Sequence, residues 1–150
     1  MMFGSPPLYR GVSTAKHGQT GGRLLPKAVG PFEYRFVHDG TIRHDGSATY
    51  GSSERNAILR HQLNQAGFPT AGVSTTPYLE RAHFYATRGG RERGVIYAIE
   101  RTRFAALGIR EFRVAEHVTH PSIPEDDEVI LVANDGGEIS RETILDILEV

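Results

Sequence analysis

The chain of 150 residues contains no cysteine, which excludes disulfide frameworks and metal sites built from thiolates. It has no apolar run near the roughly 20 residues that a membrane-spanning helix needs. Its first residues lack the basic and then apolar order of a secretory signal peptide. Its net charge of −1 gives little attraction to nucleic acid. We therefore expect no membrane association and no dedicated nucleic-acid binding.

The composition that remains is that of a globular protein. Hydrophobic residues make up 39% of the chain and charged residues 23%. No internal repeat, low-complexity tract or linker divides the sequence. A length of 150 residues allows a substantial core, so we expect a single domain over residues 1–150.

The hydrophobic pattern predicts more strands than helices. Strands are expected at Leu8–Val12, Phe32–Val37, Ala71–Thr75, Gly94–Ile99, Glu111–Val114, Val129–Ala133 and Thr143–Val150. Helices are expected at Ser53–Ala66, from Pro77 to about Thr87 with Thr76 as N-cap, and as a single turn at Phe104–Leu107. Residues 13–31, rich in Gly, Ser, Thr and Pro, indicate a loop. Together these elements predict an α+β fold with antiparallel sheets.

Three short segments each place a polar group at the end of an apolar, strand-like run. They are Leu8–Gly11 with Arg10, Gly72–Pro77 with Ser74, and Glu125–Leu131 with Glu128. Each has an ordinary structural explanation when taken alone: a surface arginine, a strand end that caps the next helix, and a solvated acidic turn. Together they would supply a cation, a hydroxyl and a carboxylate to one site.

These three side-chain types suit a phosphate-bearing sugar. A guanidinium offers a planar fork of donors that fits phosphate or ribose oxygens. A carboxylate at the end of a strand can stabilise positive charge that develops on a sugar carbon, as in glycosidases. The hydroxyl of Ser74 can hydrogen-bond that carboxylate and hold its position.

The order Arg10, Ser74-Thr75-Thr76 and Glu128 resembles the signature of the Arg–Ser–Glu branch of the ADP-ribosyltransferases, which includes many bacterial toxins and effectors. The resemblance extends from Tyr9 to Leu131. It implies an α+β fold of two packed antiparallel sheets that form an NAD cleft with flanking helices. It also implies NAD as the substrate, with no metal.

The resemblance also assigns roles. Arg10 would contact the NAD phosphate or ribose, the backbone of Gly11 would meet the nicotinamide amide, and Ser74 would position Glu128 on the nicotinamide ribose. The catalytic residues are then expected to be Arg10, Ser74 and Glu128. The cofactor-binding residues are expected to be Arg10, Gly11, Ser74, Thr75, Tyr78, Phe84 and Tyr85, although aromatic side chains on a helix are often core residues.

Two positions depart from the family pattern. The serine motif ends in Thr76 rather than Ser. The family commonly carries Glu or Gln two residues before the catalytic Glu, where it helps to select the acceptor, and here that position is Asp126, preceded by Glu125. We expect Asp126 and Glu125 to take part in acceptor selection, but the acceptor residue itself does not follow from the sequence.

We therefore expect a mono-ADP-ribosyltransferase that cleaves NAD at the nicotinamide glycosidic bond and transfers ADP-ribose to a macromolecule, favouring a protein. The alternatives are an NAD glycohydrolase and a non-catalytic module that binds a nucleotide or ADP-ribose. A nucleic-acid acceptor is disfavoured, although the Arg88–Arg93 loop could meet phosphates. Such an enzyme would act in the cytoplasm or be delivered into a target cell, and its own cell would need an immunity protein or antitoxin.

Two further patterns concern charge and flexibility. Arginines crowd the third quarter of the chain and acidic residues its tail, which predicts two solvated faces that attract each other. Gly18–Arg23 has the glycines of a phosphate loop but not the Gly-Lys-Ser/Thr ending, so we expect a flexible loop that could cover the site.

Overall fold

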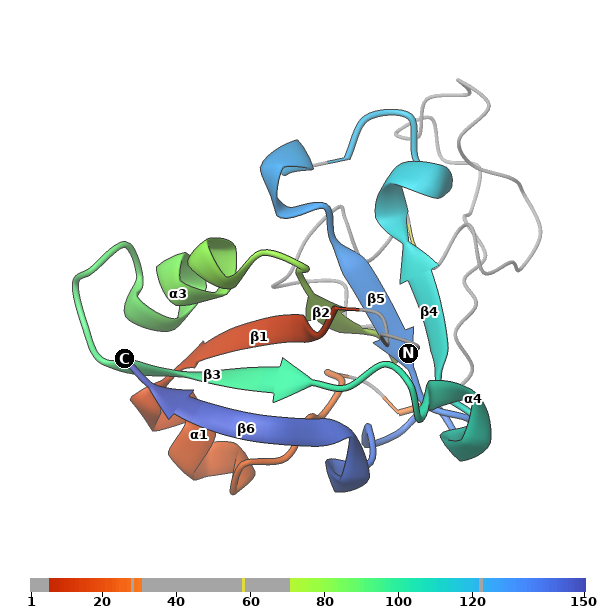
Figure 1. The fold of residues 1–150 in the computed structure, drawn as a ribbon, viewed down its shortest axis with the longest axis horizontal. Coiled ribbons are helices and arrows are strands. Elements are labelled where there is room, and N and C mark those ends of the chain that lie inside the picture. The colour runs from red at the N-terminus through yellow and green to blue at the C-terminus, as the bar shows by residue number, and fades with distance from the viewer. Residues whose placement is uncertain (1–5, 28, 31–57, 59–70, 122) are drawn as a thin grey trace, which may run out of the picture.

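The computed structural model describes residues 6–27, 29–30, 58, 71–121 and 123–150. Within these residues the chain forms two antiparallel sheets of three strands each (Figure 1). The first sheet has the order β1 (Leu8–Ser13), β3 (Gly94–Ile99), β6 (Ile144–Glu149). The second has the order β2 (Val73–Thr75), β5 (Val129–Val132), β4 (Arg110–Arg113). The predicted α+β class with antiparallel sheets is confirmed.

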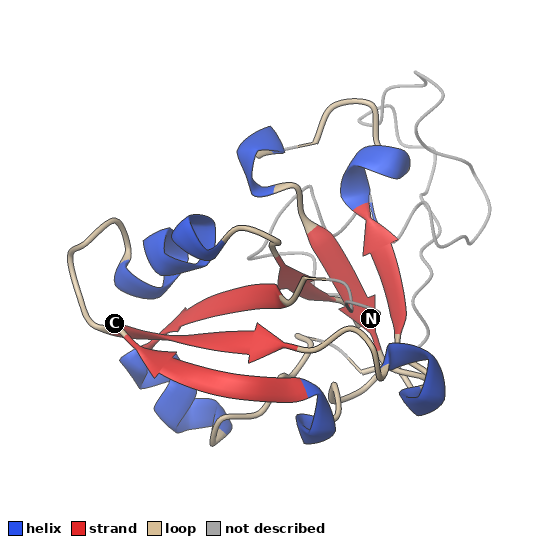
Figure 2. Cartoon of the chain, viewed as in Figure 1, coloured by secondary structure: helices blue, strands red, loops and turns tan. Residues whose placement is uncertain are grey.

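The helices are short and lie around the sheets (Figure 2). The α-helices of the described residues are α1 (Thr14–Thr20), α3 (Leu79–Thr87) and α4 (Phe104–Leu107). Single 3₁₀ turns follow at η1 (Val114–Glu116), η2 (Pro124–Asp126) and η3 (Arg141–Thr143). Helix α3 lies beside β1 and β3 in Figure 1, and this contact becomes important for the site.

Strand β3 is buried along its whole length because both of its faces are covered. Successive side chains of a strand point to opposite faces. Accordingly Tyr97 joins Leu8 and Leu131 in a core that both sheets share, whereas Ile96 packs against Ala82 and Ala86 of α3. The two sheets are thus packed on each other, and their shared core holds β1, β2 and β5 at one place.

Residues 13–31 do not form a continuous loop as predicted, because Thr14–Thr20 is helical. The Ser13 side chain caps this helix by accepting a hydrogen bond from the Lys16 amide at 3.1 Å, and Gly21 ends it with a left-handed φ of 65°. Helix α1 buries none of its residues completely. It therefore lacks the apolar stripe by which a helix is predicted from sequence.

Helix α3 begins at Leu79 rather than at Pro77, and Thr76 is not its N-cap. The hydroxyl of Thr76 accepts from the Tyr78 amide at 3.1 Å and donates to the carbonyl of Asp126 at 2.6 Å. Val114, predicted as the end of a strand, starts η1 instead. The remaining described strands lie within a residue or two of the predicted bounds, as does α4.

Two predicted elements lie outside the described residues. They are the strand Phe32–Val37 and most of the helix Ser53–Ala66. Ile58, the described residue within that helix, is helical and fully buried against the second sheet. Its placement agrees with the predicted apolar stripe at this one position.

Gly94 allows α3 to lie directly on the end of β3. A Cβ atom at this position would stand 2.0 Å from the carbonyl oxygen of Ala86, which is part of the helix backbone. By contrast, a Cβ at Gly18 in the exposed helix α1 would meet no atom within 4 Å. Helix packing therefore requires glycine at position 94, whereas position 18 has room for a side chain.

We predict that Gly94→Ala lowers the free energy of unfolding by about 1–3 kcal/mol or more, because the helix must move to admit the methyl group. Gly18→Ala should raise it by about 0.5–1 kcal/mol, because alanine loses less backbone entropy in a helix. Chemical denaturation of both variants checks the pair. A Gly94→Ala protein as stable as the wild type would show that α3 does not lie this close to β3.

Candidate active site

A chain of two hydrogen bonds joins the three residues Arg10, Ser74 and Glu128. The Nη1 of Arg10 donates to the backbone carbonyl of Ser74 at 2.9 Å. The hydroxyl of Ser74 donates to Oε2 of Glu128 at 2.5 Å. All three residues are half-buried. The predicted contact between Ser74 and Glu128 is therefore present, and Arg10 reaches the same place.

Backbone pairing explains why these residues meet. Tyr9 and Thr76 exchange two backbone hydrogen bonds, of 2.7 and 2.9 Å, which set β1 beside the end of β2. The antiparallel register of β2 and β5 places Thr75 opposite Val129. Glu128 directly precedes β5, so it lies next to the end of β2. Strand pairing thus brings together residues that are 64 and 54 positions apart.

Arg10 is a half-buried cation. Burial lowers the pKa of its guanidinium, whereas the neighbouring Tyr97 and Glu128 raise it. An arginine remains charged near neutral pH despite such a shift. A positive charge is therefore fixed beside the Glu128 carboxylate, in surroundings where water screens it less than at the surface.

Three residues near Arg10 were not predicted. Tyr97 lies opposite Arg10 in the β1–β3 register, and its hydroxyl is 2.6 Å from Nδ1 of His17. Burial raises the pKa of Tyr97, while hydrogen bonding to Thr20 and the charge of Arg10 lower it. Tyr97 lies in an apolar strand and in the shared core, and the sequence carries no signal that its hydroxyl contacts His17.

The third residue near Arg10 that was not predicted is Lys27, on the segment that follows α1. Partial burial lowers its pKa, and so do the positive charges of Arg10 and Lys16. Positive charge therefore gathers around Arg10. Such a group of cations suits an anionic ligand.

Two further predicted residues flank the site. Thr75 neighbours Ser74 in β2 but is buried on the opposite face, where its hydroxyl donates to the carbonyl of Val129 at 2.7 Å. Gly11 follows Arg10, and a Cβ there would stand 1.8 Å from the carbonyl oxygen of Ala82 in α3. Glycine is thus required at this position by helix packing. Contacts of Thr75 and Gly11 with a cofactor stay predictions.

The predicted acceptor-selecting residues differ sharply in exposure. Glu125 is exposed, whereas Asp126 is buried with 8% of its surface accessible. The carboxylate of Asp126 accepts hydrogen bonds from Arg81 and from the hydroxyl of Tyr85. Sequence reasoning missed Arg81, although Arg81 and Tyr85 are spaced i, i+4 and therefore share a helix face.

Two aromatic residues of α3, Phe84 and Tyr85, lie close to Arg81, and Tyr78 precedes the helix. Tyr78, Phe84 and Tyr85 are partly exposed, and the Arg81 guanidinium lies 4.7 Å from the Phe84 ring centroid. The Tyr85 hydroxyl donates a hydrogen bond to Asp126. Stacking of these rings on nicotinamide stays a prediction.

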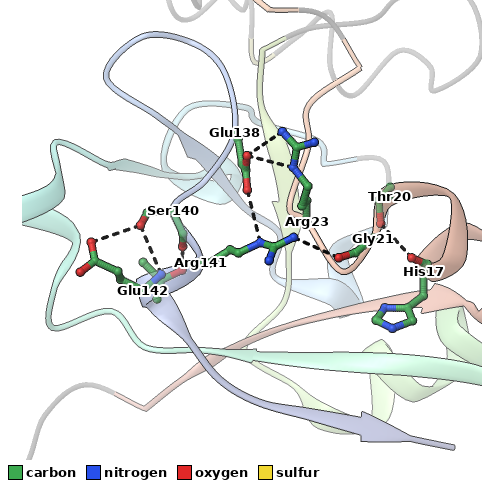
Figure 3. A network of polar contacts seen from close by, with 9 residues as sticks. His17, Thr20, Gly21, Arg23, Glu138, Ser140, Arg141 and Glu142 are labelled. Atoms are coloured by element: carbon green, nitrogen blue, oxygen red, sulfur yellow. Dashed lines mark hydrogen bonds and ion pairs between the residues drawn. The ribbon is translucent and has the colours of Figure 1, made fainter.

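The segment Gly18–Arg23 is tied down by its neighbours (Figure 3). The guanidinium of Arg23 donates to Glu138 at 2.9 and 3.1 Å, and Arg141 donates to the carbonyl of Gly21 at 3.1 Å. The hydrogen bond to Glu138, and after it the charge of Glu138, raises the pKa of Arg23. These exposed ion pairs contribute little stability individually. The segment was predicted to be a flexible loop, but it is partly helical and is held by these contacts.

Within the described residues we find no helix with the length and apolarity that a bilayer crossing requires. Across the same part of the chain, no three His, Asp or Glu side chains are grouped so that they could hold a metal ion.

The chain matches the model of the NarE family over residues 7–131, which is most of its length. The chain belongs to the NarE family. NarE is an ADP-ribosyltransferase-like family, so this membership supports an ADP-ribosyltransferase-like enzyme. The matched region contains Arg10, Ser74 and Glu128. A search of curated proteins found no match.

The Tyr85 hydroxyl gives a test of the geometry beside Glu128. Burial, together with the hydrogen bond to Asp126, raises the pKa of Tyr85 from 10.0 to about 12. The folded protein therefore keeps this proton at a pH where the unfolded chain has lost it. The stabilising contribution is complete below pH 10 and is lost as the pH rises towards 12.

We predict that the wild type loses stability more steeply between about pH 10 and pH 12 than Tyr85→Phe does, because phenylalanine has no proton to lose. Denaturant unfolding across this pH range measures the difference. Parallel curves for the two proteins would show that Tyr85 titrates as an ordinary exposed tyrosine.

Proposed function

We propose that this protein is a mono-ADP-ribosyltransferase of the Arg–Ser–Glu branch, which uses NAD as its substrate and a protein as its acceptor. The observation that carries the proposal is the hydrogen-bonded chain from Arg10 through Ser74 to Glu128. Membership of the NarE family supports the same reaction class. Intact residues at all three positions argue against a non-catalytic binding module.

The proposed roles follow from the charges and contacts of each residue. Arg10, with the positive charges of Lys16 and Lys27 nearby, would bind the diphosphate of NAD. Ser74 would hold the Glu128 carboxylate in a fixed orientation through its 2.5 Å hydrogen bond. Glu128 would then stabilise the positive charge that develops on the ribose as its bond to nicotinamide lengthens.

The leaving group needs no protonation, because nicotinamide departs from NAD as a neutral pyridine. The rate enhancement must therefore come from positioning and from electrostatic stabilisation of the ribose. A half-buried carboxylate, held by a hydroxyl and close to a half-buried guanidinium, would supply both. The acceptor nucleophile would complete the transfer by attacking the same ribose carbon.

Incubation of the purified protein with NAD labelled on its adenosine, with and without lysate protein, tests the reaction. Label on protein supports the proposed transfer. Free labelled ADP-ribose as the sole product would identify an NAD glycohydrolase, in which water is the acceptor, and would overturn the transferase assignment. Label on nucleic acid would move the acceptor to another class, and no turnover would favour the binding module.

We predict that Glu128→Gln keeps NAD affinity within about tenfold, while turnover falls by a factor on the order of 100 or more. The amide preserves the shape of the side chain but removes the charge that opposes the developing cation. Glu92→Gln, in the exposed loop after α3, is the matched control and should turn over NAD normally. Unchanged turnover in Glu128→Gln would remove this residue from the mechanism.

We predict that Arg10→Lys weakens NAD binding substantially and Arg10→Ala weakens it further. A lysine keeps the charge but cannot reproduce the planar fork that bonds Ser74 and would bond a phosphate. Calorimetric titration with NAD measures the three affinities, with Arg91→Lys as an exposed control. Equal affinities for all three proteins would leave Arg10 with a structural role alone.

A further inference from the structure

The turn that precedes Glu128 is fastened to helix α3 through Asp126. Nε of Arg81 donates to Oδ1 of Asp126 at 2.7 Å, and the Tyr85 hydroxyl donates to Oδ2. Both oxygens of the carboxylate are therefore engaged by one helix. The side chains of Arg81 and Asp126 are 24% and 11% exposed, so water screens this ion pair far less than one at the open surface.

The orientation of Arg81 is itself fixed. Its guanidinium lies 4.7 Å from the ring centroid of Phe84 and 5.5 Å from that of Tyr85. Both distances are within the range of a cation–π contact. A guanidinium held by two rings loses less freedom when it binds a carboxylate than a solvated one would lose.

Residues of two strand regions hold the same turn as well. The Thr76 hydroxyl, at the end of β2, donates to the carbonyl of Asp126 at 2.6 Å. Asp127 adopts a left-handed φ of 43°, and Arg113 of β4 binds its carboxylate at 2.9 and 3.1 Å. The turn of residues 124–127 is thus attached to α3, β2 and β4.

Glu128 is the next residue, and its own contacts depend on the path of this turn. Its backbone carbonyl accepts from the Val114 amide at 3.0 Å, and its carboxylate accepts from Ser74. A displacement of the turn by about 1 Å would break the short bond to Ser74. Displacements of this size can cost on the order of 100-fold in rate when a reacting group is misplaced.

We propose that Arg81 and Tyr85 are positioning residues, which hold the turn of residues 124–127 through Asp126 and so fix Glu128 against Ser74. Asp126 is then a structural anchor and does not select the acceptor, contrary to the role implied by its place two residues before Glu128. The catalytic consequence rests on the proposed function, whereas the anchoring itself does not.

The anchoring is tested by hydrogen exchange. The amides of Asp126 and Asp127 donate within the turn, to the carbonyls of Ile123 and Pro124 at 3.1 Å each. Arg81→Met should raise their exchange rates by about tenfold or more, because local opening of the turn becomes easier. Arg88→Met, at the far end of the helix and 72% exposed, is the matched control and should leave them unchanged. Unchanged rates in Arg81→Met would overturn the anchor.

The catalytic consequence is tested by measuring hydrolysis of labelled NAD and transfer to lysate protein separately. If Asp126 acts only by positioning Glu128, Asp126→Asn and Arg81→Met should each lower both reactions together, by about tenfold or more, with NAD affinity kept within about threefold. If Asp126 instead selects the acceptor, Asp126→Asn would lower transfer while hydrolysis persists, and the proposal would be overturned.

Two further variants distinguish the loss of this one contact from a general loss of folding. The double variant Arg81→Met/Asp126→Asn should lose no more turnover than the stronger single variant does, because both substitutions remove the same Arg81–Asp126 interaction. Tyr85→Phe deletes only a hydroxyl from a partly exposed ring and should lower turnover less than Arg81→Met does. Additive losses in the double variant would contradict the proposal. A wild type that turns over no NAD would refute the proposed function, and the exchange rates would still decide the anchor.

Discussion

The two backbone hydrogen bonds between Tyr9 and Thr76 are the constraint on which the site depends. Tyr9 belongs to β1 of the first sheet, and Thr76 directly follows β2 of the second sheet. Their pairing lets Arg10 reach the carbonyl of Ser74. Because side chains alternate along a strand, a slip of one residue would turn Arg10 to the opposite face and remove it from Ser74. The shared core of the two sheets makes such a slip costly, since Leu8 would leave the core as well.

Charge in this region is balanced residue by residue rather than between two broad faces. Three acidic residues, Asp126, Asp127 and Glu128, follow one another in the sequence. Arg81 binds the first and Arg113 the second, while Arg10 lies close enough to Glu128 for each to sense the other's charge. Consecutive carboxylates would otherwise repel one another as they become buried. The attraction expected between the arginine-rich quarter and the acidic tail thus takes the form of specific pairs that shape the site.

The apolar strands could be predicted because burial imposes a pattern that local sequence carries. Strand β3 is the clearest case, since Gly94–Ile99 is apolar throughout and buried on both faces. The meeting of Ser74 with Glu128 could not be predicted from spacing, and it was expected only through the resemblance to a family. The ion pair of Arg81 with Asp126 joins residues 45 positions apart, and neither spacing nor the family resemblance predicts it. Helix α1 was missed for a third reason, because it has caps at both ends but no buried apolar face.

The proposed anchoring of Asp126 would change which carboxylate of the turn could face an acceptor. The Asp126 side chain points to α3, where Arg81 and Tyr85 engage both of its oxygens. Glu125, one residue earlier, is exposed and lies on the same 3₁₀ turn as Asp126. If the turn holds Glu128 as proposed, acceptor recognition would fall to the exposed residues of the turn, and of the two residues predicted for that role only Glu125 is exposed.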